Sequence, residues 1–401
     1  MTDAVPEGRP KPRVIVPALG VMQILAWGST FYVLAVLTPE IAAETGWTTD
    51  WVVAGISVGL LVAGVVSPRV GRAIGAHGGR LALAGGAALI GLGLLMLGTT
   101  QNYVWYIAAW VIIGGGMGAG LYDAAFATLG SIYGRDARNA IASVTLFGGF
   151  SSTVIWPITA LLIEYVGWRG ACLTYAAVFI GLVVPAYLLI LPRRSFIAPA
   201  ADRALASRVT LEGQERWLFV LVAAVVTIGA AILSLMGNLM LLLLQGRGME
   251  LAAAVALGTL IGPSAVGARM IERFAGNQYH PIWTMMASTL LVAIGALLFL
   301  FEFTYIALGV IFYAAGNGIG TIAKGTLPLA LFGPERYPAL VGRLGLPVMV
   351  AMAAAPFAGA VAYRLGGAPW TLLILCTIAL TNVVLVMLLF RLSGAARRAG
   401  G

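Results

Sequence analysis

The sequence predicts an all-α polytopic membrane protein, with twelve transmembrane helices in two pseudo-symmetric halves of six. The 401-residue chain is 60% hydrophobic and 10% charged, with a mean hydropathy of +0.97, values that no ordinary water-soluble domain of this length approaches. Its apolar residues form continuous runs of about 20, enough for a helix to cross a bilayer and about twice a barrel strand. A glycine-rich segment of the first half recurs in the second.

Charged residues or glycine and proline turns bound each apolar run. The first run follows the basic stretch GRPKPR but continues to about Leu37, which is too long for the apolar part of a signal peptide. The expected spans lie near residues 14–37, 51–68, 81–99, 104–131, 140–163, 171–191, 217–242, 251–268, 282–301, 304–332, 340–362 and 370–390.

The longest polar stretch, PRRSFIAPAADRALASRVTLEGQER, joins spans six and seven near the centre of the chain. Its composition is typical of a linker between two compact parts. The sequence therefore predicts an N-terminal half over residues 1–191, a cytoplasmic linker over 192–216 and a C-terminal half over 217–401.

An internal repeat supports this division. The segments GGGMGAGLYDAAFATLGSIYGRDAR and AAGNGIGTIAKGTLPLALFGPERYP superpose at an offset of 200 residues. The superposition matches Gly116, Gly118 and Gly120 to Gly316, Gly318 and Gly320. Spans four and ten are therefore interpreted as the same element used twice.

The basic residues are distributed unequally between the two sides of the predicted membrane. With the amino terminus in the cytoplasm, 20 Lys and Arg residues fall inside, against only Arg169, Arg247 and Arg364 outside. This is the positive-inside pattern of a chain with both termini cytoplasmic. The net charge of +9 thus reflects orientation in the inner membrane and not nucleic-acid binding.

No catalytic, metal-binding or cofactor-binding pattern is visible in the sequence. Cys172 and Cys376 each lie inside an apolar run, and His77, in a predicted loop, and His280, at a span end, have no nucleophile or ligand partner nearby in sequence. A phosphate-binding GxxxxGK[ST] motif is missing, so no ATPase is encoded. We expect a protein that is not an enzyme and that needs no cofactor or metal.

Asp123 in span four and Lys324 in span ten are charged residues inside apolar runs. A charge near the bilayer centre costs at least about 2.5 to 3.5 kcal/mol, so each must face a cavity or a partner. Counting about 1.5 Å per residue from Arg135 and Glu335 places both roughly 16 to 18 Å from the cytoplasmic helix ends. On span four the face of Asp123 is lined by the small residues Gly116, Ala119, Gly120, Ala127 and Gly130.

Further polar and aromatic residues lie on spans one, four, seven and ten. The candidates for contact with a solute are Gln23, Trp27, Thr30, Tyr122, Asn238, Asn317 and Thr321. Hydrogen bonding between helices is an equally good interpretation for several of them. For the charged pair we favour Lys324 as an anion-binding charge and Asp123 as its counter-ion or as a proton acceptor, with a structural ion pair as the alternative.

The loop VGRAIGAHGGR between spans two and three is similar to the signature of the major facilitator superfamily, and the two-half organisation of the whole chain resembles it too. The matching positions are Gly71, Arg72, Gly78 and Arg80, an expected conformational switch loop. Gly75 and Ala76 stand where the family has an acidic and a basic residue. In the family that acid helps to latch the cytoplasmic side of the outward-open state, so its absence weakens the transfer of this function.

The segments SIYGRDARNAIASV and GWRGA look closest to the bacterial monocarboxylate and oxalate/formate-like branch of that superfamily. The resemblance implies a major facilitator fold and a cavity lined by spans one, four, seven and ten. It also implies a monomeric secondary transporter that moves a small organic solute, such as a monocarboxylate, by alternating access, with a proton or an exchange anion as coupling partner. The alternative is a proton-driven exporter of amphiphilic or cationic compounds.

The topology is open to a direct test by cysteine labelling. We expect a cysteine introduced near Ser207 in the linker to react with an impermeant thiol reagent only after the membrane is permeabilised. A cysteine near Thr48 should react from outside in intact cells. The reverse pattern would reject the orientation.

Overall fold

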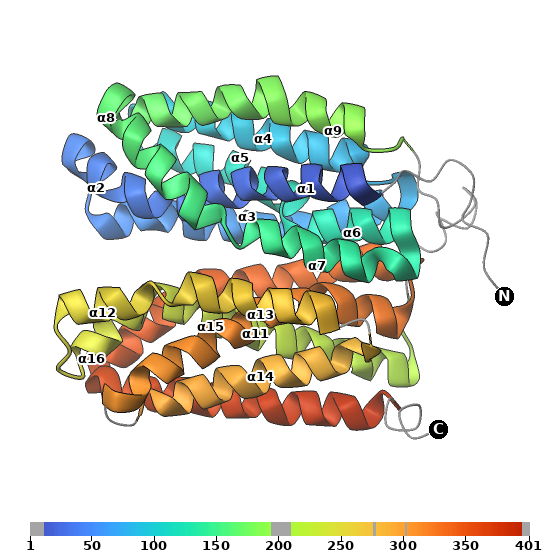
Figure 1. The fold of residues 1–401 in the computed structure, drawn as a ribbon. Coiled ribbons are helices and arrows are strands. Elements are labelled where there is room, and N and C mark those ends of the chain that lie inside the picture. The colour runs from blue at the N-terminus through green and yellow to red at the C-terminus, as the bar shows by residue number, and fades with distance from the viewer. Residues whose placement is uncertain (1–11, 194–209, 276–277, 301–302, 395–401) are drawn as a thin grey trace. The chain divides into compact units, whose positions relative to one another are not determined.

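The computed structural model describes residues 12–193, 210–275, 278–300 and 303–394, and the regular elements in these ranges are helices (Figure 1). The chain forms two compact units. The first comprises Met1–Val209 and Phe332–Leu346, and the second Thr210–Leu331 and Pro347–Gly401. Most of the expected linker lies outside the described residues, and the expected halves stay a prediction. The short segment 332–346 packs within the first unit although it is distant in sequence.

The helices of each unit run side by side (Figure 1). From the N-terminus the chain forms α1 Pro12–Trp27, the π-helix η1 Gly28–Tyr32, α2 Leu34–Thr45, α3 Thr49–His77, α4 Arg80–Gly98, α5 Tyr103–Gly120, α6 Tyr122–Tyr133, the 3-10 helix η2 Gly134–Asp136, α7 Ala137–Gly148, α8 Ser151–Val178, the π-helix η3 Phe179–Val183 and α9 Val184–Ile190. It continues with α11 Gly213–Gln245, α12 Leu251–Gly258, α13 Ile261–Ala275, α14 Pro281–Leu298, α15 Phe303–Phe332 and α16 Tyr337–Leu392.

Eight helical stretches of the described chain are long and apolar enough to cross a membrane. Tyr103–Ile190 contains three of the expected spans, and Tyr337–Leu392 contains two. The expected span 251–268 is not among the eight, because its helix is divided into the short α12 and α13 at residues 259–260. With this division taken into account, each expected span has a helical counterpart.

Two glycines separate spans that otherwise form one continuous helix. Gly167 inside α8 has φ 70° and ψ 172°, and Gly367 inside α16 has φ 68° and ψ −163°. A positive φ is strained for residues with a Cβ, so glycine suits both hairpin turns. The two turns lie 200 residues apart, the same offset as the repeat in spans four and ten.

The glycines of the repeat are points where neighbouring helix backbones nearly touch. A Cβ added at Gly116 would lie 2.7 Å from the carbonyl oxygen of Gly86, and one at Gly316 would lie 2.7 Å from that of Ser288. A Cβ at Gly118 would likewise meet the carbonyl oxygen of Ala63 at 2.7 Å. Gly318 makes the equivalent approach to Ala265 in the second unit. Both units therefore build the same helix crossings from small residues, as helices in lipid commonly do.

A polar clasp ties together one end of the first unit. Arg169 donates from Nε to Glu44 Oε1 at 2.9 Å and from Nη1 to the carbonyl oxygen of Thr100 at 2.5 Å. Its guanidinium lies 4.4 Å from the ring centroid of Trp168, whose indole also donates to Glu44. The GWRGA segment thus joins the ends of α2 and α4 to α8.

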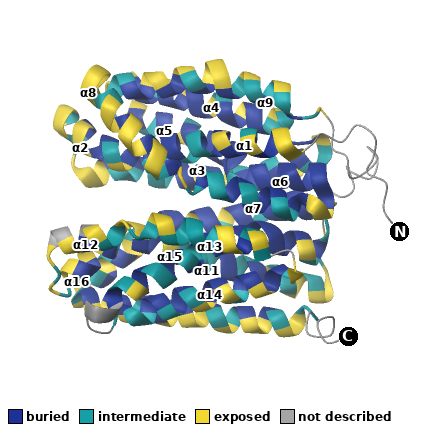
Figure 2. Cartoon of the chain, in the orientation of Figure 1, coloured by how far each residue is buried: buried dark blue, intermediate teal, exposed yellow. Residues whose placement is uncertain are grey.

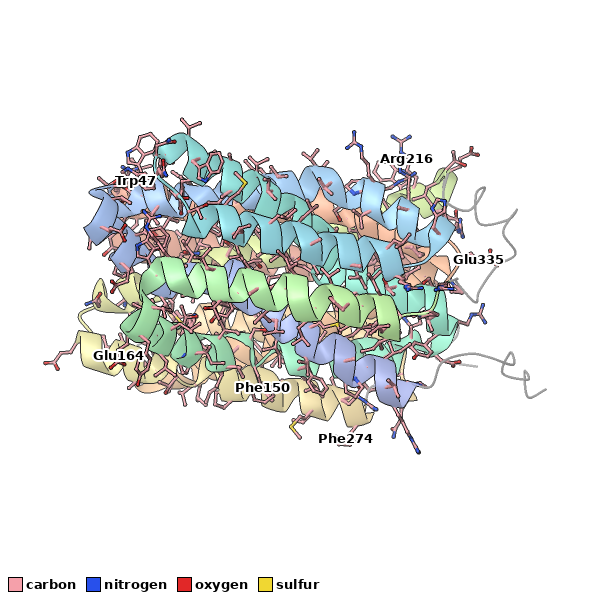
Figure 3. The ribbon with its side chains drawn as sticks, turned by 90° about the horizontal axis from the view of Figure 1, so that it is seen from above. Trp47, Phe150, Glu164, Arg216, Phe274 and Glu335 are labelled. Atoms are coloured by element: carbon pink, nitrogen blue, oxygen red, sulfur yellow. The ribbon has the colours of Figure 1, made fainter. Side chains whose placement is uncertain are left out.

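Residues that connect consecutive spans of the first unit lie at opposite ends of the helices, as spans that run in alternating directions require. Trp47 and Glu164, which follow spans one and five, lie at one end of the helices, and Glu335 lies at the other (Figure 3). Exposed residues recur along α8 and α9 (Figure 2). They include the large side chains of Tyr165, which is 76% exposed, and Leu189, which is 84% exposed. Exposure on this scale is unfavourable in water and natural against acyl chains.

The backbone contacts of the repeat predict sharply different effects for neighbouring glycines. Gly116→Ala should destabilise the protein by about 1 to 3 kcal/mol, because the new methyl group forces α4 and α5 apart. Gly115→Ala should be tolerated, since its Cβ would meet only the Leu89 side chain at an ordinary 3.6 Å. Thermal unfolding in detergent measures both variants, and equal melting temperatures would contradict this account of the crossing.

Candidate functional site

Span one is not a single regular helix, as the sequence suggested, but contains a π-helical turn at Gly28–Tyr32. Ser29 and Thr30 lie in this turn, and their hydroxyls donate to the carbonyl oxygens of Leu25 and Ala26 at 2.7 and 2.6 Å. Thr30 is fully buried. The Thr30 hydroxyl therefore satisfies a backbone acceptor in the π-helical turn. Such turns are frequent at functional sites.

Span four is also interrupted, which corrects the expectation of one helix over 104–131. The α5 helix ends at Gly120, and Leu121 takes an extended conformation with ψ −170° before α6 begins at Tyr122. Gln23 of span one, fully buried, donates from Nε2 to the carbonyl oxygen of Gly120 at 2.7 Å. The amide of Gln23 thus serves the backbone at the break, as a link between helices.

The break explains how an acidic residue is accommodated in this apolar segment. Asp123 lies in the first turn of α6 and is 6% exposed. The amino-terminal end of a helix carries partial positive charge, which stabilises a carboxylate there. Counting helix faces across Leu121 was therefore wrong, because Gly116 and Ala119 belong to α5, which ends at Gly120, whereas Asp123 belongs to α6.

Residues 337–346 of α16 pack closely on α3 and α6 within the first unit. A Cβ added at Gly71 would lie 2.8 Å from Cα of Gly342, and one at Gly342 would lie 2.6 Å from the carbonyl oxygen of Ser67. A Cβ at Gly345 would contact the Ser67 side chain and lie 3.4 Å from Oδ2 of Asp123. We call this contact of α3 with residues 337–346 the glycine seam; Asp123 borders it.

The expected switch loop over residues 71–80 is mostly helical, which corrects its assignment as a loop. Gly71 and Arg72 belong to α3, which extends to His77, and Arg80 begins α4. Gly78 ends α3 with φ 83°, and its N–H donates to the carbonyl oxygen of Ile74 at 2.8 Å. Of the predicted switch residues, Gly71 thus lies in the glycine seam, and Gly78 forms the short turn that follows α3.

In the second unit, Asn317, Thr321 and Lys324 follow one another at helical spacing on α15, and all three are partly exposed. Asn317 donates to the carbonyl oxygen of Tyr313 and Thr321 to that of Asn317, each at 3.1 Å. The spacing of Asn317, Thr321 and Lys324 places the polar groups along a single face of the helix. A pairing of Lys324 with Asp123 stays a prediction.

Asn238 on α11 is exposed, and its Nδ2 donates to the carbonyl oxygen of Ser234 at 2.7 Å. Ser234 is buried and donates in turn to the carbonyl oxygen of Met352 at 2.7 Å. Ser234 therefore links two helices of the second unit, whereas Asn238 presents its amide at an accessible surface.

The structure also shows a buried carboxylate that the sequence analysis missed. Glu272 on α13 is 6% exposed and accepts hydrogen bonds from the hydroxyls of Tyr279 and Thr284, both at 2.7 Å. The signal was present as an acid within a strongly amphipathic segment. It was overlooked because the apolar run was taken to end at residue 268, whereas α13 continues to Ala275.

The glycine seam yields a prediction with a matched control on the same helix. In a variant with Ser67→Cys, Gly71→Ala should raise the rate of maleimide labelling several-fold, because the added methyl group forces residues 337–346 away from α3. Gly75→Ala should leave the rate unchanged, since its Cβ would meet only Pro338 Cβ at 3.6 Å. The parent with buried Cys172 and Cys376 supplies the background. Equal labelling in both glycine variants would count against the seam.

The chain is similar to known proteins both in sequence and in structure. The sequence profile described as Major Facilitator Superfamily matches residues 19–280, and no curated protein sequence matches the chain. The human organic anion transporter MFSD10 has a similar structure, with a TM-score of 0.74 at 16% identity over 94% of this chain and 100% of that one.

Two further solved structures share this architecture. The fucose:proton symporter FucP of E. coli gives a TM-score of 0.72 at 14% identity, covering 94% of this chain and 98% of that one. The proton:xylose symporter XylE gives 0.68 at 11% identity, covering 93% and 94%. These likenesses confirm the expected fold class of twelve helices in two halves. Because the profile match covers more than half of the 401-residue chain, the chain belongs to the Major Facilitator Superfamily and is a multi-pass membrane transporter.

Proposed function

We propose that this transporter is a secondary carrier that moves a small organic anion, such as a monocarboxylate, across the inner membrane by alternating access. The observation that carries the proposal is Lys324, a partly exposed cation within the apolar helix α15. Asn317 and Thr321 extend its face with an amide and a hydroxyl. An ammonium group at this depth is costly unless it meets an anion or a polar cavity.

The polar groups on α15 suit the recognition of a carboxylate. An ammonium supplies a charge-assisted hydrogen bond, and neighbouring amide and hydroxyl donors fix the orientation of the two oxygens. One structurally similar protein is described as an organic anion transporter, which agrees with this reading. The monocarboxylate branch of the family remains part of the proposal.

Proton coupling is assigned to Asp123. Its carboxylate is buried at the start of α6 and borders the glycine seam, so a change in its charge acts where α3 and residues 337–346 meet. Two of the structurally similar proteins are described as proton symporters. We propose that the carrier works as a monomer with both termini in the cytoplasm, and that a proton or an exchange anion accompanies the solute.

An aromatic contact at the start of α6, where Asp123 also lies, favours a second candidate function. Trp27 and Tyr122 have ring centroids 5.1 Å apart, and aromatic faces attract organic cations. A proton-driven exporter of amphiphilic or cationic compounds would use Asp123 as its cation site. The charge of the solute decides between the two candidates.

Neutral variants of the two charged residues test the proposal. Lys324→Gln should weaken binding of a labelled monocarboxylate by about 10- to 100-fold, as expected for loss of one charge-assisted hydrogen bond. Asp123→Asn should keep binding but lose pH-driven accumulation, because asparagine preserves the volume and cannot change charge. Binding and uptake are measured in proteoliposomes.

The matched control is Arg216→Gln, which removes an exposed positive charge from the first turn of α11 and should change neither quantity. Unchanged carboxylate binding in Lys324→Gln would overturn the organic-anion proposal. Full pH-driven accumulation in Asp123→Asn would show that its carboxylate has a structural role only.

A further inference from the structure

Spans one and four carry a continuous stack of aromatic rings in the first unit. The ring of Trp27 lies 5.1 Å from that of Tyr122, which in turn stacks on Phe126 at 5.1 Å with an interplanar angle of 11°. Phe31 meets Trp27 edge-on at 5.7 Å, and Tyr32 lies 6.5 Å from it. We call these five residues the aromatic stack.

One end of the aromatic stack is buried and the other is accessible. Phe126 is fully buried, whereas Trp27, Phe31, Tyr32 and Tyr122 are each partly exposed. In α6 the contrast is sharp, because every residue after Tyr122 is buried. The stack is therefore held in the core at Phe126 and is partly accessible at its four other members.

The accessible end coincides with the two irregularities in the helices. Trp27 is the last residue before the π-helical turn that contains Phe31 and Tyr32, and Tyr122 is the first residue after the break at Leu121. A π-turn widens the helix and redirects its side chains, and such turns are frequent at functional sites. The irregular backbone thus places rings from both spans together.

The indole of Trp27 retains an unused donor. Its Nε1 is buried and makes no hydrogen bond within the part of the chain that the structure describes. Nearby Trp156 instead donates from Nε1 to the carbonyl oxygen of Tyr32 at 2.9 Å. The Nε1 of Trp110 is likewise buried without a hydrogen-bond partner among the described residues. Trp110 is fully buried, however, whereas part of Trp27 is accessible. Trp27 is thus a partly accessible aromatic residue whose buried indole N–H has no hydrogen-bond partner among the described residues.

We infer that the aromatic stack is a specificity-determining surface for the body of the solute, and that the preferred organic anion carries an aromatic or conjugated ring. This inference rests on the proposed function, which gives the solute its negative charge. The ring of the solute packs against Trp27 and Tyr122. Ring pairs of this kind add affinity beyond the area they bury.

Binding of two acids that differ only in ring chemistry tests the inference. Benzoate and cyclohexanecarboxylate have the same charge and similar size, and calorimetric titration of the purified full chain in nanodiscs measures both. We expect benzoate to bind roughly three- to ten-fold more tightly. Trp27→Leu and Tyr122→Leu should abolish this preference while cyclohexanecarboxylate still binds.

Two further variants guard against loss of folding as the explanation. Trp27→Phe keeps a ring at the same position and should keep most of the preference for benzoate. Trp105→Leu removes a 44% exposed tryptophan of α5 that lies outside the stack and should leave the preference intact. Equal affinity for the two acids in the parent, or a preference that survives both leucine variants at the stack, would overturn the inference.

A cationic probe separates this inference from the proposed function. If benzyltrimethylammonium binds in a Trp27-dependent manner and neither acid binds, the organic-anion function fails while the aromatic surface is supported. If cyclohexanecarboxylate and benzoate bind equally through Lys324, the function stands and the aromatic surface is rejected. Failure of both ring-bearing probes to bind also rejects the surface.

Discussion

The close approach of helix backbones at glycine is the constraint on which the rest of the structure depends. In a bilayer, helices gain little from burying apolar surface against one another, because lipid is equally apolar. Their association depends on van der Waals contact, and small residues allow it. Gly116 and Gly316 make the same crossing in the two units, each with a neighbouring carbonyl oxygen 2.7 Å from the position of an added Cβ.

These crossings make each unit a firmly packed scaffold, and the irregular backbone is concentrated where the candidate site lies. The π-turn in span one and the break in span four meet at the aromatic stack, and Asp123 follows the break directly. Irregular helices expose backbone groups that lipid cannot satisfy. Gln23 meets this requirement at Gly120, so a polar residue that resembles a ligand-binding group also stabilises the fold.

The sequence was sufficient to predict the helical class, the spans and the repeat, because hydropathy and glycine spacing are properties of the chain alone. It did not predict the break at Leu121, since no proline marks it and apolar residues continue on both sides. The assumption of one regular helix then misplaced the neighbours of Asp123. The seam between Gly71 and Gly342 depends on packing between segments far apart in sequence, which no local pattern reports.

For other parts of the site the sequence identified individual residues but not their surroundings in the fold. Trp27 and Tyr122 were predicted as candidates for solute contact on separate spans, and their ring contact followed only from the structure. The buried Glu272 was missed because the length of α13 depends on tertiary packing of an amphipathic helix, which overrides the end of the apolar run.

The central claim is that the chain carries an organic anion without an energy source of its own, and counterflow measures this most directly. Liposomes containing the purified protein are loaded with unlabelled benzoate and diluted into labelled benzoate, with no ATP and no ion gradient. The account predicts a transient accumulation of label above equilibrium that fades as the internal pool drains. Absence of this overshoot for benzoate, together with an overshoot for a lipophilic cation, would contradict it.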